Sequence, residues 1–317
     1  MKRLAILVLA AAALLAGCGG DDGPGGGEPG KPVALKVGVL PIADVAPVYL
    51  GIDKGFYREE NLAIEPQVAA GGAAIVPSVV SGDFQFGFSN IVSPIIAGGK
   101  GLPIQIIAAG SQAGDDDSKV LVNEDSPIRG PKDLEGKKIA VNTLNNIGTV
   151  TLNNTLEKEG VDISTLQFVE IDFPDMQAAL EAGRVDAIWE KEPFITRAEE
   201  AGAREIINPY TSTAARLAVG VYFSSRRYIE QNRDVVDRFV RATKRSLEFA
   251  ESNPGEVRRI ITEFTQTPSE VAKVMDLPHW SSELNPGHTR LLTDLTVKYG
   301  LLDEKPDLTE LIYEGGT

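Results

Sequence analysis

Residues 73–88 read AAIVPSVVSGDFQFGF, and residues 176–189 read MQAALEAGRVDAIW. In each stretch a helix-like spacing of apolar residues ends at a glycine, Gly82 or Gly183, and a strand-like run follows within a few positions. The two glycines are about 100 positions apart. Repetition of one helix–glycine–strand unit at that spacing indicates two similar lobes rather than one long sheet.

Strand and helix patterns alternate on both sides of these units. The expected strands are Leu35–Leu40, Leu62–Val68, Phe84–Phe88, Pro103–Ala109, Lys138–Val141, Leu166–Ile171, Val185–Trp189 and Ala218–Ser224. The expected helices are Pro47–Lys54, 73–81, Ile91–Ala97, Thr149–Glu159 and Met176–Ala182, and the chain from Asp234 onward is almost entirely helical. Such alternation predicts an α/β fold with parallel-rich sheets.

Two polar segments mark where the chain passes between the lobes. Asp115-Asp116-Asp117 follows Gly114 and predicts the first crossing, and Asn208–Arg216 predicts the return. We therefore assign residues 33–117 and 223–317 to lobe 1 and residues 118–222 to lobe 2. Two lobes joined by a double-crossing hinge form a cleft, where ligand sites occur preferentially and where hinge closure can enclose a ligand.

Composition excludes several classes of function. The formal net charge is −14, so the chain lacks the basic surface that binding to nucleic acid requires. A single cysteine excludes an internal disulfide and any cysteine-rich metal site. With only His279 and His288, there is little room for a histidine-based metal site or catalytic triad, and we expect no metal or cofactor.

The first 18 residues have the features of an export signal. Lys2 and Arg3 precede an apolar run, Leu4–Gly17, whose 14 residues are fewer than the ~20 that span a bilayer. Leu15–Cys18 resembles the bacterial lipobox, which implies lipidation of Cys18; the alternative is a plain signal peptide with an incidental cysteine. Residues 19–32, GGDDGPGGGEPGKP, predict a flexible tether. We therefore expect a body anchored by lipid outside a bacterial membrane, whether periplasmic or at the cell surface.

Several short motifs occur in one order along residues 33–317. They are Val37–Val39 (VGV), Gly51–Tyr57 (GIDKGFY), Asn61–Glu65 (NLAIE), Gly71-Gly72, Ser81–Asp83 (SGD), Asp133–Val141 (DLEGKKIAV) and Val185–Phe194 (VDAIWEKEPF). This series resembles the solute-binding proteins of ABC importers for nitrate, sulfonates, taurine and thiamine precursors. The resemblance implies a type II periplasmic-binding-protein fold, no catalysis, and delivery of a small molecule to a membrane permease; we expect the protein to be a monomer. Asn61 departs from the glycine usual in that family, but asparagine also tolerates a left-handed turn.

Candidate ligand contacts follow the expected strands, because ligands of open α/β sheets lie beyond the carboxyl ends of the strands. In lobe 1 these candidates are Asp44, Gly71, Gly72, Ser89 and Asn90. A helix cap explains Asp44, Ser89 and Asn90 equally well, and a tight turn explains Gly71-Gly72.

The candidates in lobe 2 are Asn142, Thr143, Asn145, Asn146, Trp189, Glu190 and Glu192, with Tyr222 on the cleft wall. The group from Asn142 to Asn146 is the best polar site, because it combines side-chain amides with the free N–H groups of a helix start. Trp189 beside carboxylates can stack on and hydrogen-bond a flat heterocycle, although core packing would explain it as well.

The charges of these loops favour one class of solute. The loops contain Asp44, Glu190 and Glu192, no arginine, and Lys191 as their only lysine. Carboxylates bind hydrogen-bond donors, so we expect an amine-, amide- or pyrimidine-bearing solute rather than a simple anion. The alternative is an oxyanion held by asparagines and helix-start N–H groups alone.

Two other functions remain open at this stage. A sensory receptor that does not transport needs the same two lobes, so the sequence does not separate it from a transport protein. A thiamine-pyrimidine synthase of similar chain order would need a reactive histidine and a cysteine-rich segment in the body. The body of this chain has no cysteine, which makes the enzyme the weaker alternative.

Overall fold

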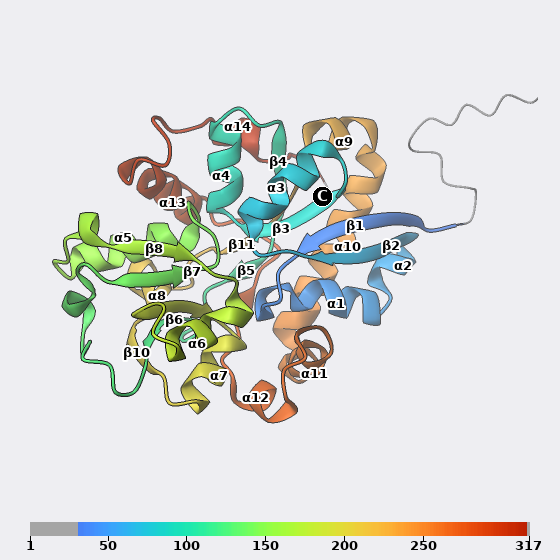
Figure 1. Ribbon diagram of the computed structural model, residues 1–317. Coiled ribbons are helices and arrows are strands. Elements are labelled where there is room, and N and C mark those ends of the chain that lie inside the picture. The colour runs from blue at the N-terminus through green and yellow to red at the C-terminus, as the bar shows by residue number, and fades with distance from the viewer. Residues whose placement is uncertain (1–30, 316–317) are drawn as a thin grey trace, which may run out of the picture.

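The computed structural model describes residues 31–315, and Figure 1 shows them as two α/β lobes. Cys18, the expected signal and nearly all of the expected tether lie outside the described residues. Within 31–315 no helix is both long and apolar enough to cross a membrane.

Lobe 1 is built on a mixed five-stranded sheet with the order β2-β1-β3-β11-β4. Its strands are β1 (Val33–Val39), β2 (Leu62–Val68), β3 (Phe86–Asn90), β4 (Ile104–Ala109) and β11 (Gly220–Ser225). β1 pairs in parallel with β2 and β3, whereas β11 runs antiparallel to β3 and β4.

Lobe 2 repeats this arrangement with the order β8-β7-β9-β6-β10. Its strands are β6 (Ser118–Val122), β7 (Lys138–Val141), β8 (Gln167–Glu170), β9 (Ala187–Lys191) and β10 (Arg204–Ile207). β7 is parallel to β8 and β9, while β6 is antiparallel to β9 and β10. The fourth strand of each sheet, β11 or β6, is the one that enters its lobe after a crossing. The two lobes are thus equivalent in topology, as the repeated sequence unit indicated.

Helices cover the sheets. Lobe 1 carries α1 (Ala46–Asp53), α2 (Phe56–Glu59), α3 (Gly72–Ser81) and α4 (Val92–Gly99), and lobe 2 carries α5 (Ile147–Lys158), α6 (Phe173–Glu181), α7 (Phe194–Glu200) and α8 (Pro209–Thr213). The 3₁₀ turns are Ala43–Val45, Pro131–Leu134 and Ile163–Thr165. The C-terminal helices are α9 (Arg226–Gln231), α10 (Arg233–Ser252), α11 (Pro254–Thr265), α12 (Ser269–Val274), α13 (Pro286–Lys298) and α14 (Leu308–Leu311).

The long helix α10 buries its apolar side in lobe 1. Val236, Phe239, Val240 and Leu247 have no exposed surface, and the Phe239 ring stacks on Phe86 of β3 at a centroid distance of 3.9 Å. α10 also contacts α1 and β4, so it ties the C-terminal segment to the first half of the chain.

Two hydrogen-bonded segments form the hinge. The first crossing (residues 110–117) and the return crossing (residues 214–219) exchange backbone hydrogen bonds: Ala113 N donates to Leu217 O (2.8 Å), and Val219 N donates to Ser111 O (2.9 Å). A third segment joins them, because β5 (Ser111–Gln112) pairs with β12 (His279–Trp280). The lobe boundary expected after Tyr222 falls inside β11, so residues 220–222 pair with the lobe 1 sheet.

Replacing Phe239 by alanine tests how far lobe 1 depends on α10. We expect Phe239→Ala to lower the free energy of unfolding by ~3–5 kcal/mol, because it leaves a cavity against Phe86. The measurement is urea unfolding followed by circular dichroism. The matched control is Val274→Ala on α12, whose side chain is 67% exposed and which should change stability by less than about 0.5 kcal/mol. Equal effects of the two variants would contradict the assigned core.

Candidate ligand-binding site

A small cavity lies where the two lobes meet. It is lined by Leu40, Ile42, Asp44, Phe88, Asn90, Asn142, Asn146, Ile147, Phe173, Trp189, Lys191, Tyr210 and Val219. These residues come largely from the carboxyl ends of β1, β3, β7 and β9, with one from the return crossing. The cavity has a volume of about 20 Å³, enough for roughly one water molecule. We call it the cleft cavity.

Asp44 is the acidic residue that lines the cleft cavity from lobe 1. It lies in the 3₁₀ turn after β1 and is 1% exposed. Its Oδ1 accepts a hydrogen bond from Ser111 Oγ (2.6 Å), and its backbone oxygen accepts one from Trp280 Nε1 (3.0 Å). Its Oδ2 has no hydrogen-bond partner within the described residues. A buried carboxylate oxygen that has no hydrogen bond can accept a hydrogen bond from a ligand.

Lys191 at the end of β9 faces Asp44 from lobe 2. Its Nζ lies 2.6 Å from Asp117 Oδ2 and 3.4 Å from Asp44 Oδ2, and all three side chains are buried. It also lies 4.8 Å from the centroid of the Tyr210 ring. Burial alone would lower the pKa of Lys191, but the carboxylates of Asp117 and Asp44 raise it above its ordinary value. Lys191 is therefore charged, and one ammonium with two carboxylates gives the group a formal charge of −1.

Burial acts on the pKa of Asp117 in the direction opposite to its effect on the pKa of Lys191. Removal from water raises the pKa of the Asp117 carboxyl, while the Lys191 ammonium opposes that shift. Gly114 N also donates to Asp117 Oδ1 at 3.0 Å. Asp117 is thus fixed both by the hinge backbone and by Lys191.

Three asparagines line the cavity wall, and two of them, Asn142 and Asn90, connect the lobes. Asn142 Nδ2 donates to Ala70 O across the cleft at 2.9 Å, and Asn90 Oδ1 accepts from Ile147 N at 3.3 Å. Asn146 Nδ2 donates to Asn142 Oδ1 (2.9 Å) and to Thr143 Oγ1 (3.0 Å). In this structure the side-chain amides are hydrogen-bonded to protein groups within and between the lobes.

Gly71 and Gly72 lie beside the cavity without lining it. A Cβ atom on Gly71 would lie 2.7 Å from Asn142 Nδ2, and one on Gly72 would lie 1.7 Å from Ser89 Oγ. Glycine is needed at both positions because a side chain approaches the backbone closely at each: Asn142 of lobe 2 at Gly71, and Ser89 of lobe 1 at Gly72. The Ser89 hydroxyl, which lies beside Gly72, donates a hydrogen bond to the backbone oxygen of Asn90 (2.8 Å).

Aromatic side chains form another part of the wall. Trp189 is 2% exposed, and its Nε1 donates to Ser118 Oγ (3.0 Å). Its ring lies 6.0 Å from Tyr210 and 5.7 Å from Phe173, measured between centroids. With Phe88, these rings give the cavity flat apolar surfaces of the kind on which a planar ligand can stack.

Glu190 and Glu192 do not line the cavity. Successive side chains of a strand point to opposite faces, so Trp189 and Lys191 share the cavity face and Glu190 is on the other. Neither Glu190 oxygen has a hydrogen-bond partner within the described residues, and burial raises its pKa well above the usual range. Glu192 Oε1 accepts from Thr196 Oγ1 (2.8 Å) and Asp276 N (3.3 Å), and burial raises the pKa of Glu192 to about 7.

The other predicted residues have mixed positions. Thr143 is buried beside the cavity as a partner of Asn146. Asn145 is exposed and left-handed, with φ 55°, and Tyr222 is buried in lobe 1, where its ring meets Phe88 and Phe239. Of the residues predicted from the sequence, the cavity brings together Asp44, Asn90, Asn142, Asn146 and Trp189.

The prediction missed Leu40, Ile42, Phe88, Ile147, Phe173, Tyr210 and Val219, and it treated Lys191 only as the single lysine of the loops. Strand alternation could have identified Lys191, because residues two positions apart in a strand, such as Trp189 and Lys191, lie on the same face. No local pattern marks Tyr210, which reaches the cavity from the segment that leads into the return crossing.

Both histidines lie at the hinge rather than in the cavity. His288 Nδ1 accepts a hydrogen bond from Ala218 N (3.1 Å), and His279 in β12 pairs with Glu251 at 3.0 Å. Within residues 31–315, no group of three potential metal-binding histidine, cysteine or acidic side chains occurs.

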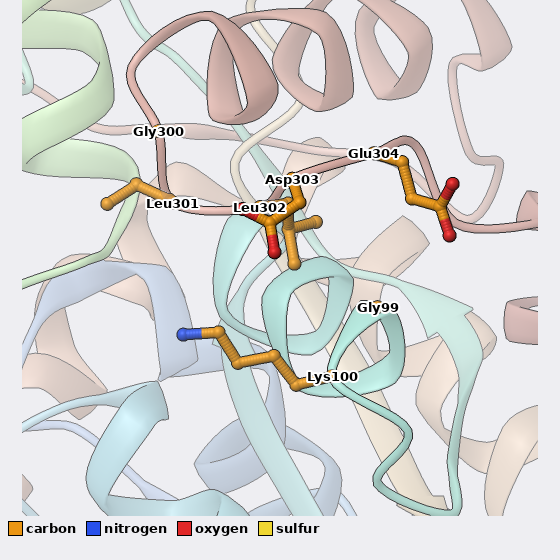
Figure 2. Close-up of a pocket in the computed structure, with 7 residues that line it drawn as sticks. All are labelled: Gly99, Lys100, Gly300, Leu301, Leu302, Asp303 and Glu304. Atoms are coloured by element: carbon orange, nitrogen blue, oxygen red, sulfur yellow. The ribbon is translucent and has the colours of Figure 1, made fainter.

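A larger recess occurs on the surface of lobe 1, with a volume of about 620 Å³. It lies between the end of α4 and the loop after α13 and shares no residue with the cleft cavity. Figure 2 shows the amine of Lys100 and the carboxylate of Glu304 pointing in opposite directions. Because these exposed charges do not converge, the recess is a weaker candidate than the cleft.

Comparison with known proteins supports this view of the fold. The chain is 24% identical over 281 residues to a putative aliphatic sulfonates-binding protein of Bacillus subtilis, covering 86% of this chain and 81% of the relative. It is 21% identical over 217 residues to the formylaminopyrimidine-binding protein of Halalkalibacterium halodurans, covering 68% and 64% of the two chains.

Two solved structures show the same architecture. The alkanesulfonate-binding protein SsuA from Xanthomonas axonopodis pv. citri, bound to MOPS, superposes with a TM-score of 0.76 at 19% identity, covering 89% of this chain and 99% of that one. The desulfurization enzyme DSZB superposes with a TM-score of 0.65 at 17% identity, covering 88% and 96% of the chains, so the fold also occurs in an enzyme.

The family model described as NMT1/THI5 like matches residues 42–257, which is more than half of the chain. This match includes both crossings and every residue that lines the cleft cavity except Leu40. The type II periplasmic-binding-protein fold and the family resemblance expected from the motifs are both confirmed, and the chain belongs to the NMT1/THI5-like family.

Proposed function

We propose that this chain is an extracytoplasmic solute-binding protein, without catalysis, that captures a small molecule between its lobes and delivers it to the permease of an ABC importer. The observation that carries the proposal is the cleft cavity, which both lobes and the return crossing line at the carboxyl ends of the strands. The binding roles for which the sulfonate- and formylaminopyrimidine-binding relatives are named support it.

Capture requires the lobes to separate, because a cavity of about 20 Å³ does not hold a solute. The contacts that would break lie outside the hinge. Ala43 N donates to Glu192 O (2.9 Å) beside the cavity, and the Asn142 amide bridges to Ala70. On the outer surface, Tyr299 OH donates to Glu157 Oε2 (2.9 Å), and Lys298 pairs with the same carboxylate. The hinge hydrogen bonds would survive as the lobes rotate.

The solute that suits this cavity bears an amine or a pyrimidine. Within the described residues Asp44 Oδ2 is a buried acceptor with no hydrogen bond, paired only with the Lys191 ammonium at 3.4 Å, and the lining residues include no arginine and only one lysine. The rings of Phe88, Trp189 and Tyr210 supply the apolar faces that a flat heterocycle needs. A simple anion would find a group of formal charge −1, which disfavours it.

The leader sequence supplies the proposed location. Lipidation of Cys18 would hold the body at the outer side of the cytoplasmic membrane or at the cell surface, and residues 19–32 would serve as the tether.

Replacing the lipidated residue tests this location. We expect Cys18→Ala to move the exported protein from the membrane fraction to the soluble fraction in a bacterial host, because the acyl anchor cannot form. Immunoblots of the two fractions provide the measurement, with wild type as the reference. An unchanged distribution would contradict the anchor but not the fold.

The solute class is tested by thermal unfolding of the full-length protein with 4-amino-2-methylpyrimidine, ethylamine, ethanesulfonate and nitrate. A ligand that binds only the folded state stabilises it by ~2.7 kcal/mol at a hundredfold excess over Kd. We expect the amine-bearing probes to raise the melting temperature and Asp44→Asn to weaken their binding by roughly tenfold or more, because a hydrogen bond to a charged acceptor is lost. Stabilisation by ethanesulfonate or nitrate alone would contradict this class.

The matched control for Asp44→Asn is Asn145→Gly. Asn145 is exposed, lies outside the cavity and has a left-handed backbone that glycine adopts easily. We expect its affinity for the probes to equal that of the wild type. Equal losses in both variants would show that the assigned cavity is not the binding site.

Glu192 predicts a pH dependence of stability. Its pKa of about 7 in the folded protein exceeds the 4.5 of an ordinary glutamate, so the folded state binds this proton more tightly than the unfolded chain. The resulting stabilisation is complete below about pH 4.5 and is lost as the pH rises through about 7. The contribution to the slope is at most ~1.4 kcal/mol per pH unit.

Urea unfolding at pH 5 and pH 8 measures this effect. We expect the wild type to lose more stability than Glu192→Gln between the two values, since the amide cannot titrate. Glu283→Gln, at an exposed position, is the control and should follow the wild type. If Glu192→Gln shows the wild-type pH dependence, burial of Glu192 does not govern it.

A further inference from the structure

The charged group in the cleft draws on three parts of the molecule. Asp44 belongs to lobe 1, Asp117 lies at the end of the first crossing, and Lys191 ends β9 of lobe 2. Ser118 pairs with Lys191 in the β6–β9 register, so Asp117 and Lys191 sit next to each other on one body. Asp44 instead is bound to Ser111 at the start of the hinge. A rotation of the lobes would keep Lys191 beside Asp117 and move it relative to Asp44.

The Lys191 ammonium lies closer to the carboxylate of Asp117 than to that of Asp44. Its Nζ is 2.6 Å from Asp117, within the range of a charge-assisted hydrogen bond, but 3.4 Å from Asp44. The Tyr210 ring lies 4.8 Å from the same nitrogen. The other oxygen of Asp117 accepts a hydrogen bond from Gly114 N at 3.0 Å. The result is that Asp44 Oδ2 keeps no hydrogen-bond partner among the described residues, although a cation lies nearby.

We propose that Asp117 is a positioning residue for solute specificity: it holds the Lys191 ammonium back from Asp44, so that Asp44 Oδ2 stays available to an N–H donor of the solute. This inference rests on the proposed function and names a residue that need not touch the solute. The Lys191 ammonium moderates the two buried negative charges, and Asp117 determines where that positive charge lies.

Removing the charge of Asp117 should reduce the selectivity for solutes with N–H donors. In Asp117→Asn, Asp44 becomes the strongest anion within reach of Lys191, and the ammonium pairs with it. The acceptor is then occupied, and the formal charge of the group changes from −1 to 0. Solutes with N–H donors lose their partner, and acidic solutes lose part of the repulsion that disfavoured them.

The test is isothermal titration of full-length wild type, Asp117→Asn and Asp117→Asn/Lys191→Gln with 4-amino-2-methylpyrimidine and ethanesulfonate. We expect Asp117→Asn to weaken binding of the aminopyrimidine on the order of tenfold. The double variant should recover to within about threefold of wild type, because without the ammonium nothing competes for Asp44. A residue that only supports the local structure would not be rescued by a second change in its partner.

The double variant also guards against misfolding of the single one, because it replaces an ion pair with two neutral amides. If Asp117→Asn does not fold by circular dichroism, the double variant alone decides. Binding close to that of wild type supports the inference, and a loss as large as that of Asp44→Asn overturns it.

The outcomes separate this inference from the proposed solute class. If wild type binds the aminopyrimidine and Asp117→Asn binds it equally well, the positioning role is wrong while the solute class stands. If wild type binds only ethanesulfonate, or neither probe, Asp44 is not the acceptor and both are overturned.

Discussion

The backbone hydrogen bonds between the two crossing segments are the constraint on which the rest of the molecule depends. They hold residues 111–113 and 217–219 side by side, and β12 adds a third segment at the same place. Each crossing then supplies the fourth strand of the lobe that it enters, β6 or β11, antiparallel to the parallel trio. The trios therefore point their carboxyl ends at each other across the hinge (Figure 1), and the cleft cavity forms where they meet.

Local sequence patterns were sufficient for the parallel part of each sheet. The expected strands Leu62–Val68 and Lys138–Val141 agree with β2 and β7 residue for residue, because apolar or alternating runs with clear boundaries define them. β6 and β10 were not predicted. β10 has only four residues and an irregular register with β6. β6 directly follows the acidic run of the crossing and contains a lysine, so its apolar pattern is too short to predict a strand. Their pairing is decided by distant segments, which a local pattern does not report.

The site was predictable to the level of loops but not of side-chain directions. The ends of the expected strands led to Asp44, Asn90, Asn142 and Trp189 as candidate ligand contacts, and all four line the cleft cavity, since carboxyl ends of strands meet at one edge. The partners that give these residues their chemistry are remote in sequence: Asp117 and Lys191 are 74 positions apart, and Ser111 and Asp44 are 67 apart. Composition of a loop therefore gives its charge, whereas only the fold shows which charges are already paired.

This pairing sets how tightly a solute can bind. The Asn142 amide is engaged with Ala70, and Asn90 Oδ1 accepts from Ile147 N, so a solute that uses these groups replaces contacts that the lobes already make. Its net gain from them is small, because one hydrogen bond is exchanged for another. The apparent affinity also falls in proportion to the fraction of molecules that are open to binding. Asp44 Oδ2 is different, because within residues 31–315 it has no hydrogen bond and only the 3.4 Å ion pair with Lys191. Under the proposed function, discrimination between solutes would therefore depend most on this one oxygen and on the lysine held beside it.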